Sequence, residues 1–251
     1  ESSSSVIFAP SDTERMRITT TGLGIGTTSN DGALHVKGIS DHGRIVLESG
    51  GTSGSDNNMF MQFHNNGGTE IAQIAIEEGA TNEGQIVFKT GGTTTAMTID
   101  KDGHITKPLQ PSFLVQFVGS SSNQSIGVNT DTTLSFDTER FDVNSDFASN
   151  VFTAPVTGKY FLGTTQIIGN PPTDASYFEV AIVTSNRRLG NLSDYDAFDS
   201  TVTYWSTYVG GIFDMDANDT AEVRCYQAGG SANAFIYRNS ASMYFSGMLI
   251  G

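Results

Sequence analysis

Apolar and polar residues alternate in short runs along this chain, with the period of two that β-strands require. In the run 201–209, Tyr204 and Tyr208 fall on one face of a strand, and Trp205 and Val209 fall on the other. One of these faces must be buried. Because Trp rings suit packed subunits as well as partner surfaces, we interpret Trp205 as a core or subunit-interface residue in preference to a receptor contact.

The composition agrees with short strands joined by tight turns. The chain has 28 Gly and 6 Pro in 251 residues, whereas a helical protein would carry far more Leu, Lys and Glu at a 3.6-residue period. The run 221–226 alternates around the lone Cys225, which we expect to point into a core. Without an intrachain disulfide, stability must come from packing and chain association. The predicted fold class is all-β.

The first hundred residues contain internal repeats. Residues 43–52 match residues 84–93 in Gly, Ile, Val and a Gly-Gly-Thr ending, and residues 16–22 are echoed by residues 97–103. The repeated unit reads as a strand, a glycine turn and another strand. Such a unit is too short to bury its own apolar face, so it must stack on neighbours or on other copies of the chain. We expect an intertwined trimeric shaft.

Two prolines mark a joint between the repeats and the rest of the chain. Pro108 and Pro111 disfavour both helix and central-strand pairing. We place the boundary near residue 109, which gives a repetitive β shaft over 1–108 and a head over 109–251. A head of this size suits one eight-to-ten-stranded sandwich.

The head carries an aromatic corner motif. In the stretch 152–160, Pro155 supplies a fixed turn and Gly158 a permissive corner, between the strand-forming rings of Phe152 and Tyr160. With the C-terminal Phe-Ser-Gly-Met-Leu-Ile, this stretch resembles the C1q-like, tumour-necrosis-factor-like jelly roll over residues 111–251. The resemblance implies a tightly packed homotrimer that binds partners through its outer loops. The chain departs from that family at Leu162, where many relatives carry an aromatic residue, and in lacking a collagen stalk.

A second resemblance concerns the shaft. Residues 14–36 are similar to a repeat frequent in tailed-bacteriophage fibre proteins. It implies a virion component, located in an extracellular tail fibre and joined to the rest of the tail. Glu1 followed by four Ser reads as the start of a fragment or processed chain.

The net charge limits the partners. A formal charge of −14 opposes nonspecific attraction to nucleic acid or to anionic membranes, since phosphate contacts need clustered Lys and Arg. No apolar run approaches the ~18 residues of a membrane span. We therefore expect neither nucleic-acid binding nor membrane insertion.

The histidines argue against hydrolytic chemistry in the head. All four lie before the joint, which excludes a Ser-His-Asp or Cys-His site there, and none has the spacing of a metal site. The remaining catalytic alternative is a polysaccharide-degrading tailspike that uses paired carboxylates such as Asp194, Asp196 and Asp199 beside aromatic rings. Phage depolymerases usually need a much longer β-helix, so we expect no enzyme.

One acidic stretch resembles a calcium loop without meeting its requirements. In residues 214–219 the Gly needed at the sixth position is Asp219, and Cys225 stands where a bidentate Glu is required. We read it as a turn before a late strand. Asp214, Asp216 and Asn218 remain weak calcium candidates, and otherwise no cofactor is expected.

Loops are the expected functional surface, because a rigid sandwich presents them without constraint from the strand ladder. Candidate loops span 169–176, 184–199 and 228–233. The second offers hydrogen-bonding groups and a ring suited to a saccharide or a polar protein epitope. Its candidate receptor-binding residues are Arg187, Arg188, Asn191, Asp194, Tyr195 and Asp196.

The leading hypothesis is a non-enzymatic, homotrimeric bacteriophage tail-fibre protein whose head binds a glycan or protein on the host cell surface. Three weak copies of one site would act together through multivalency. The alternatives are a trimerisation clamp without its own ligand, a polysaccharide-degrading tailspike, and a non-viral secreted lectin-like C1q-domain protein.

Overall fold

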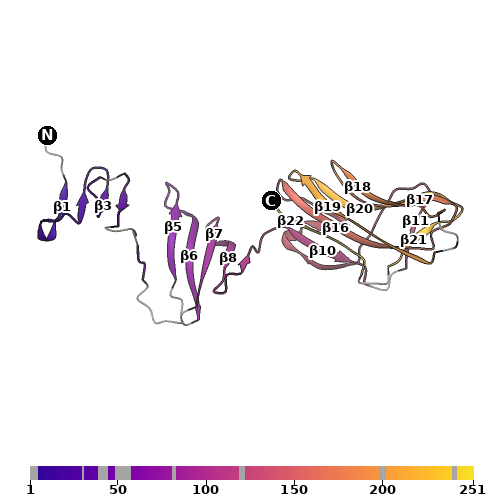
Figure 1. The fold of residues 1–251 in the computed structure, drawn as a ribbon, viewed down its shortest axis with the longest axis horizontal. Helices are drawn as coiled ribbons and strands as arrows, with labels where there is room; N and C mark the ends of the chain where they lie inside the picture. Colours follow the sequence, from indigo (N-terminus) through magenta and orange to yellow (C-terminus); the bar gives the residue numbers. More distant parts are fainter. Residues whose placement is uncertain are drawn as a thin grey trace. The chain divides into compact units, whose positions relative to one another are not determined.

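The computed structural model describes residues 5–29, 31–38, 45–48, 58–80, 83–118, 122–197, 200, 202–238 and 242–251. These residues form strands and two short 3-10 turns, which confirms the all-β prediction (Figure 1). None of the described segments is a helix long and apolar enough to cross a bilayer. The chain divides into two compact units, residues 1–105, here called unit 1, and residues 106–251, here called the head.

Unit 1 begins with a four-stranded sheet, the first sheet. Its strands lie in the order β1 (Val6–Phe8), β2 (Met16–Ile18), β3 (Leu23–Ile25) and β4 (Leu34–Val36). The first three pair antiparallel, and β4 pairs parallel to β3. Gly22 makes the turn into β3 at φ 148°, where a Cβ would lie 2.4 Å from the carbonyl oxygen of Ala33. Only glycine fits this approach of two backbones.

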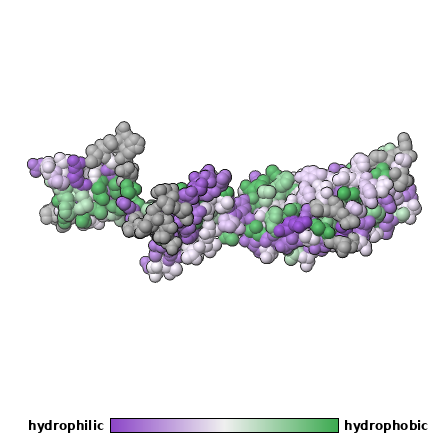
Figure 2. All heavy atoms as spheres, turned by 90° about the horizontal axis from the view of Figure 1, so that it is seen from below, coloured by the Kyte–Doolittle hydropathy of each residue, from purple (hydrophilic) through white to green (hydrophobic). Residues whose placement is uncertain are grey.

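The first sheet is apolar on one face. The residues paired across its four strands form two rows on that face. One row is Val6, Ile18, Leu23 and Leu34. The other is Phe8, Met16, Ile25 and Val36. Several of these side chains are exposed, and Figure 2 shows hydrophobic residues gathered on the surface of this sheet.

The second sheet of unit 1 is a meander of five strands. In order they are β5 (Met59–His64), β6 (Glu70–Ala80), β7 (Glu83–Thr90), β8 (Thr94–Ile99) and β9 (Ile105–Thr106). In the predicted repeat, residues 84–93 form β7 and its glycine turn, as expected. Most of the matching copy, 43–52, lies outside the described residues. The shorter echo also holds, since Met16 and Met97 both lie in strands.

The second sheet repeats the two-row arrangement of the first. One row across β5, β6, β7 and β8 is Met59, Ile76, Ile86 and Ile99. The next is Met61, Ile74, Phe88 and Met97. On the opposite face, Glu77 pairs with Lys89 at 2.6 Å and accepts a hydrogen bond from Gln85. We call the two apolar surfaces the apolar faces of unit 1.

The head is an eight-stranded jelly roll with short additional strands. Its main strands are β10 (Ser112–Gln116), β15 (Val151–Thr153), β16 (Gly158–Gly169), β17 (Ala175–Thr184), β18 (Arg188–Ser193), β19 (Tyr204–Met215), β20 (Thr220–Gly229) and β22 (Tyr244–Leu249). The first pairs with the last, β15 with β20, β16 with β19, and β17 with β18. This nested pairing is a long hairpin wrapped into a sandwich, the jelly-roll connection.

The short strands of the head complete its two sheets. They are β11 (Gln124–Ile126), β12 (Thr132–Thr133), β13 (Thr138–Asp142), β14 (Phe147–Ala148) and β21 (Ala234–Ile236). The sheet that we call the β16 sheet has the order β11-β21-β16-β22-β10-β13, with β19 also paired to β16. The other, the β20 sheet, has the order β14-β15-β20-β17-β18, with β12 also paired to β20.

One continuous core fills the space between the two sheets. At its centre the ring of Phe113 stacks on Phe152 at 4.7 Å and meets Phe245 edge-on at 5.0 Å. Cys225 is fully buried in this core, as its alternation predicted. At the corner around Pro155, the buried Tyr160 hydroxyl donates to the Val156 carbonyl at 2.7 Å, which ties the turn to strand β16.

Candidate functional site

The two sheets of the head present unlike faces to their surroundings. On the outer face of the β16 sheet, Ile212, Phe161 and Met248 lie side by side across three strands. They are 56%, 37% and 51% exposed. Phe141 on β13 pairs with Leu114 on the same face and is 48% exposed. Contiguous exposed apolar residues of this kind mark an interaction surface.

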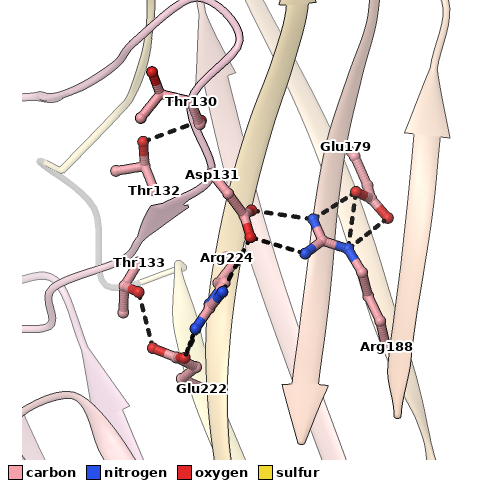
Figure 3. Close-up of polar contacts among 8 residues, drawn as sticks. All are labelled: Thr130, Asp131, Thr132, Thr133, Glu179, Arg188, Glu222 and Arg224. Carbon is pink, nitrogen blue, oxygen red and sulfur yellow. Dashed lines mark hydrogen bonds and ion pairs between the residues drawn. The ribbon is translucent and has the colours of Figure 1, made fainter.

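The outer face of the β20 sheet carries instead a network of charged groups (Figure 3). Arg188 on β18 donates to both oxygens of Asp131 at 3.0 and 3.2 Å, and to Glu179 on β17 at 2.6 Å. Arg224 on β20 donates to Asp131 at 3.1 Å and to Glu222 at 2.5 Å. Asp131 therefore joins two guanidinium groups, and through them the loop before β12 is held to three strands of the sheet.

Small residues under this network leave room for it. Ala181 lies between Arg224 on one side and Gly190 on the other, and it is fully buried. A Cβ added to Gly190 would lie 2.2 Å from the Glu179 carboxylate, so only glycine lets that side chain lie across β18 toward Arg188. The position of the Glu179 carboxylate thus depends on the absence of a side chain at Gly190.

The network holds the Asp131 carboxyl group ionised. Burial alone would raise the pKa of Asp131, but hydrogen bonds from Arg188 and Arg224 outweigh it and lower the pKa. The hydrogen bond to Glu179, followed by the one to Asp131, raises the pKa of the Arg188 guanidinium. The Arg188 side chain is 35% exposed, so solvent still reaches the cluster. The arrangement is a pre-ordered polar surface of three carboxylates and two guanidinium groups.

An aromatic pair lies on the same sheet. Tyr177 on β17 and Tyr226 on β20 have ring centroids 6.0 Å apart with planes tilted by 36°. The Asn129 side-chain oxygen accepts a hydrogen bond from the backbone of Gly229 at 3.0 Å, and the Tyr226 hydroxyl lies 3.5 Å from it. Since Glu179 pairs in register with Tyr226, the rings adjoin the charged network. Rings beside ordered hydrogen-bonding groups are a common way to bind polar ligands.

The structure distributes the six predicted receptor-binding residues over several places. Arg188 belongs to the charged network, while Arg187 pairs with Asp214 at 3.6 Å. The predicted loop 184–199 is in part strand β18, so Asn191 lies on an edge strand. Asn191 and Asp194 line a groove between β18 and β19. The six residues do not form one site.

Tyr195 does not have the exposed ring that the loop prediction assumed. It is 1% exposed, in the core, with its ring edge-on to Phe178 at 6.3 Å and to Trp205 at 6.4 Å. Burial raises the pKa of its hydroxyl. The ring fills the end of the sandwich beyond β18, and it therefore cannot stack on a ligand. Its neighbour Asp196 is exposed, and a hydrogen bond with Asp194 raises its pKa.

The groove between β18 and β19 has a volume of about 380 Å³ and is open to solvent. Trp205 and Tyr208 line it from β19, and Leu192 from β18. Their exposed fractions are 37%, 50% and 61%. The Asn191 side chain bridges the strands by donating to the Tyr208 carbonyl at 3.5 Å. Because β18 and β19 are edges of different sheets, the groove is the open side of the sandwich, and its lining mixes these apolar side chains with polar ones such as Asp194 and Ser206.

Of the weak calcium candidates, Asp216 and Asn218 lie in the turn between β19 and β20, as the sequence predicted, whereas Asp214 lies in strand β19 itself. The backbone of Asp219 donates to the Asp216 carbonyl at 2.9 Å, and Asn218 takes a φ of 75°. Asp214 is engaged by Arg187. In the described residues, the His, Cys, Asp and Glu groups that converge within 4.8 Å are Asp100, Asp102 and His104 of unit 1. There the Asp100 carboxylate accepts hydrogen bonds that close the turn after β8.

Sequence reasoning missed most of the network. Asp131, Glu179, Glu222 and Arg224 come from strands and turns far apart in the chain, and only the register of β17, β18 and β20 brings them together. A partial signal existed, because Glu222 and Arg224 are the polar, outward members of the same alternation that buries Cys225.

No known family model matches this chain, and no curated protein matches it. Solved structures do. It is similar to the globular domain of zebrafish complement 1qA protein, at 16% identity and a TM-score of 0.39, over 57% of this chain and 98% of that one. It is also similar to murine APRIL, at 13% identity and a TM-score of 0.40, over 56% and 99%.

Proposed function

We propose that this protein is a homotrimeric, non-enzymatic attachment protein, whose head binds a host cell-surface receptor. The observation that carries the proposal is the difference between the two outer faces of the head. An apolar face on a sandwich that already has a complete core is most simply explained by association. A polar face with ordered charges and rings suits contact with a hydrated partner.

The apolar outer face of the β16 sheet is the proposed contact between copies. Phe161, Ile212 and Met248 form a continuous apolar row there. The groove on the open side of the sandwich, where Trp205, Tyr208 and Leu192 lie among polar side chains, is a second and different surface. Two unlike patches favour a head-to-tail contact, which closes into a ring when the rotation allows it. A three-fold ring is the smallest one with this geometry.

The polar outer face of the β20 sheet is the proposed receptor surface. Tyr177 and Tyr226 supply ring faces, and the neighbouring carboxylates and guanidinium groups supply fixed donors and acceptors. Saccharide rings present both apolar C–H faces and hydroxyl groups, so a surface glycan is the favoured receptor, ahead of a polar protein epitope. Three copies on one trimer would turn weak single contacts into firm attachment.

The proposed setting is a bacteriophage tail fibre. Its support is the repeated strand-turn-strand pattern of unit 1, whose likeness to fibre repeats extends over residues 14–36. In this setting the chain belongs to the extracellular part of the virion and joins the rest of the tail through its N-terminal side.

A binding screen with the intact chain tests the receptor proposal. We expect the protein to bind a subset of bacterial surface saccharides on a glycan array, and Tyr226→Ala to weaken that binding at least tenfold while the native mass stays that of a trimer. Tyr204→Ala, which removes an exposed ring from the β16 sheet, is the matched control and is compared only in samples whose native mass is still that of a trimer. Equal loss in both variants would contradict a site on the β20 sheet.

The same samples separate the rival functions. A trimer that binds neither the array nor host cells would be a trimerisation clamp. Release of new reducing ends from host capsule would identify a polysaccharide-degrading enzyme. A single-copy species at working dilution would refute the trimer itself.

A further inference from the structure

The charged side chains of the β20 sheet all belong to one network. The six strands of this sheet carry four charged residues, which are Glu179, Arg188, Glu222 and Arg224. Each of them is a member of the network, and Asp131, from the loop before β12, is the fifth. Three carboxylates against two guanidinium groups leave this face with an excess of one negative charge.

The guanidinium groups of the network are already engaged by carboxylates. Arg188 donates to Glu179 through Nε and Nη2, and to Asp131 through Nη1 and Nη2. Arg224 donates to Glu222 through Nε and Nη2, and to Asp131 through Nη1. Every nitrogen of both groups therefore has an acidic partner. Because Arg recognises acids by such paired bonds, an acidic ligand would have to displace one of the carboxylates of the network itself.

The carboxylates, in contrast, can still accept hydrogen bonds. Each carboxylate offers about four lone-pair positions. Asp131 receives three hydrogen bonds, two from Arg188 and one from Arg224. Glu222 receives two from Arg224 and one from the Thr133 hydroxyl. The Asp131 and Glu222 side chains are 33% and 17% exposed, so solvent reaches both. What these carboxylates can still take up is a hydrogen-bond donor.

The two rings beside the network add an uncharged stacking surface. Tyr226 pairs in register with Glu179, and the Tyr177 ring lies 6.0 Å from it, centroid to centroid. The face of an aromatic ring carries partial negative charge, which repels an anion and attracts the C–H groups of a sugar. Asp174, directly before β17, places a further carboxylate at this end of the sheet, where it accepts a hydrogen bond from the backbone of Ser231.

We infer that the receptor saccharide of this head is free of acidic groups, and that the excess negative charge of the network excludes acidic polysaccharides. The inference rests on the proposed receptor function of the β20 sheet and names the class of glycan that this surface takes. Hydroxyl groups of neutral sugars supply donors for the carboxylates and bring no charge for them to repel. Specificity then arises from repulsion of the wrong ligand as well as from attraction of the right one.

Matched pairs of oligosaccharides test this inference on the intact chain. The members of each pair differ in one sugar, which is a hexuronic acid in one member and the corresponding neutral hexose in the other. We expect the neutral member to bind more tightly by about tenfold or more at an ionic strength of about 0.01 M, where exposed charges are screened least. At about 1 M the preference should fall toward equality, because screening then removes the repulsion.

A variant of the network and a matched control locate the source of the preference. Glu222→Gln removes the excess charge and keeps an oxygen that can accept from Arg224 or Thr133. We expect it to reduce the preference for the neutral member by about threefold or more at low ionic strength. Glu139→Gln, on β13 of the β16 sheet, changes the net charge of the chain by the same amount and should leave the preference unchanged.

The outcomes separate this inference from the proposed function. Equal or tighter binding of the acidic member at low ionic strength, weakened by Tyr226→Ala, would overturn the inference and leave the receptor site on the β20 sheet in place. Absence of binding to every pair, in a protein whose native mass is still trimeric, would overturn the proposed receptor function and the inference together. An equal change of preference in Glu222→Gln and Glu139→Gln would overturn the role of the network, because the net charge of the chain would then set the preference.

Discussion

Unit 1 and the head are made of the same kind of strand but use it differently. The head buries Phe113, Phe152 and Phe245 between two sheets of its own. Among the described residues of unit 1, the buried hydrophobic side chains are Ala75 and Val87, although this unit carries large apolar residues on both of its sheets. The difference lies in the number of layers, because a second sheet converts an apolar face into a core.

Alternation of apolar and polar residues along the strands is not sufficient for a domain to bury a core of its own. The head pairs its first strand with its last, so the chain supplies both layers. The strands of unit 1 pair mostly with their sequence neighbours and form single layers. Local pairing closes short loops at small entropic cost, yet it leaves the apolar faces uncovered. The described strands of unit 1 thus leave their apolar faces without a second layer, whereas the head supplies both layers of its own core.

Truncation of a core ring should give the largest difference between the two units in the free energy of unfolding. Phe113→Ala removes a ring that stacks in the head core, and we expect it to lower the free energy of unfolding of the head by about 3–5 kcal/mol. Phe60→Ala in unit 1, where the ring is 45% exposed, should cost less than about 1 kcal/mol. Urea unfolding followed by the fluorescence of the single Trp, Trp205, measures the first effect. Equal effects would contradict the comparison.

The charged network of the head should give a smaller, pH-dependent effect. The pKa of Asp131 is lowered in the folded state, so its contribution is complete above the unfolded-state pKa of about 3.9 and is lost as the pH falls through the lower folded-state value. We expect Asp131→Asn to cost about 1 kcal/mol at pH 7, because the side chain is partly exposed, and progressively less below pH 4.

Urea unfolding at pH 7, 5 and 3 measures this dependence. Glu139→Gln, on the exposed strand β13, is the control and should show no such trend. A cost for Asp131→Asn that is the same at pH 3 as at pH 7 would show that the ion pairs are not its source.

The ion pair of unit 1 should give the smallest effect. Glu77 and Lys89 are 2.6 Å apart, and Glu77 has one cationic partner where Asp131 has two guanidinium groups. We expect Glu77→Gln to cost about 0.5 kcal/mol or less, seen by calorimetry as a small shift of the unfolding midpoint. A loss as large as that of Asp131→Asn would mean that this pair also belongs to a wider network.

Much of the fold was predictable from local pattern. The alternation is confirmed over 207–209, because Thr207 and Val209 are buried while Tyr208 is exposed. Trp205, which the same pattern places on the buried face, is 37% exposed and lines the groove. The corner around Pro155 ends one strand and begins another, as its residues predict. These features depend on residues that are neighbours in the sequence, so the local pattern is enough to predict them.

The candidate site was much less predictable. Arg188 and Arg224 meet at Asp131 because β17, β18 and β20 pair in one register, and no short segment contains that information. The polar neighbours of Tyr195 predict an exposed loop position, but its ring is buried and packs edge-on against Phe178 and Trp205. The limit is physical, because side-chain networks and core ends are decided by tertiary packing and not by local periodicity.

The pairing of β10 with β22 also determines how the head withstands mechanical load. Tension transmitted along the polypeptide enters the head at β10, which is bonded along its length to β22 on one side and to β13 on the other. A pull along β10 stretches all of these backbone bonds at once instead of peeling them one after another. The strand next to the joint is therefore fastened in the manner that resists shear.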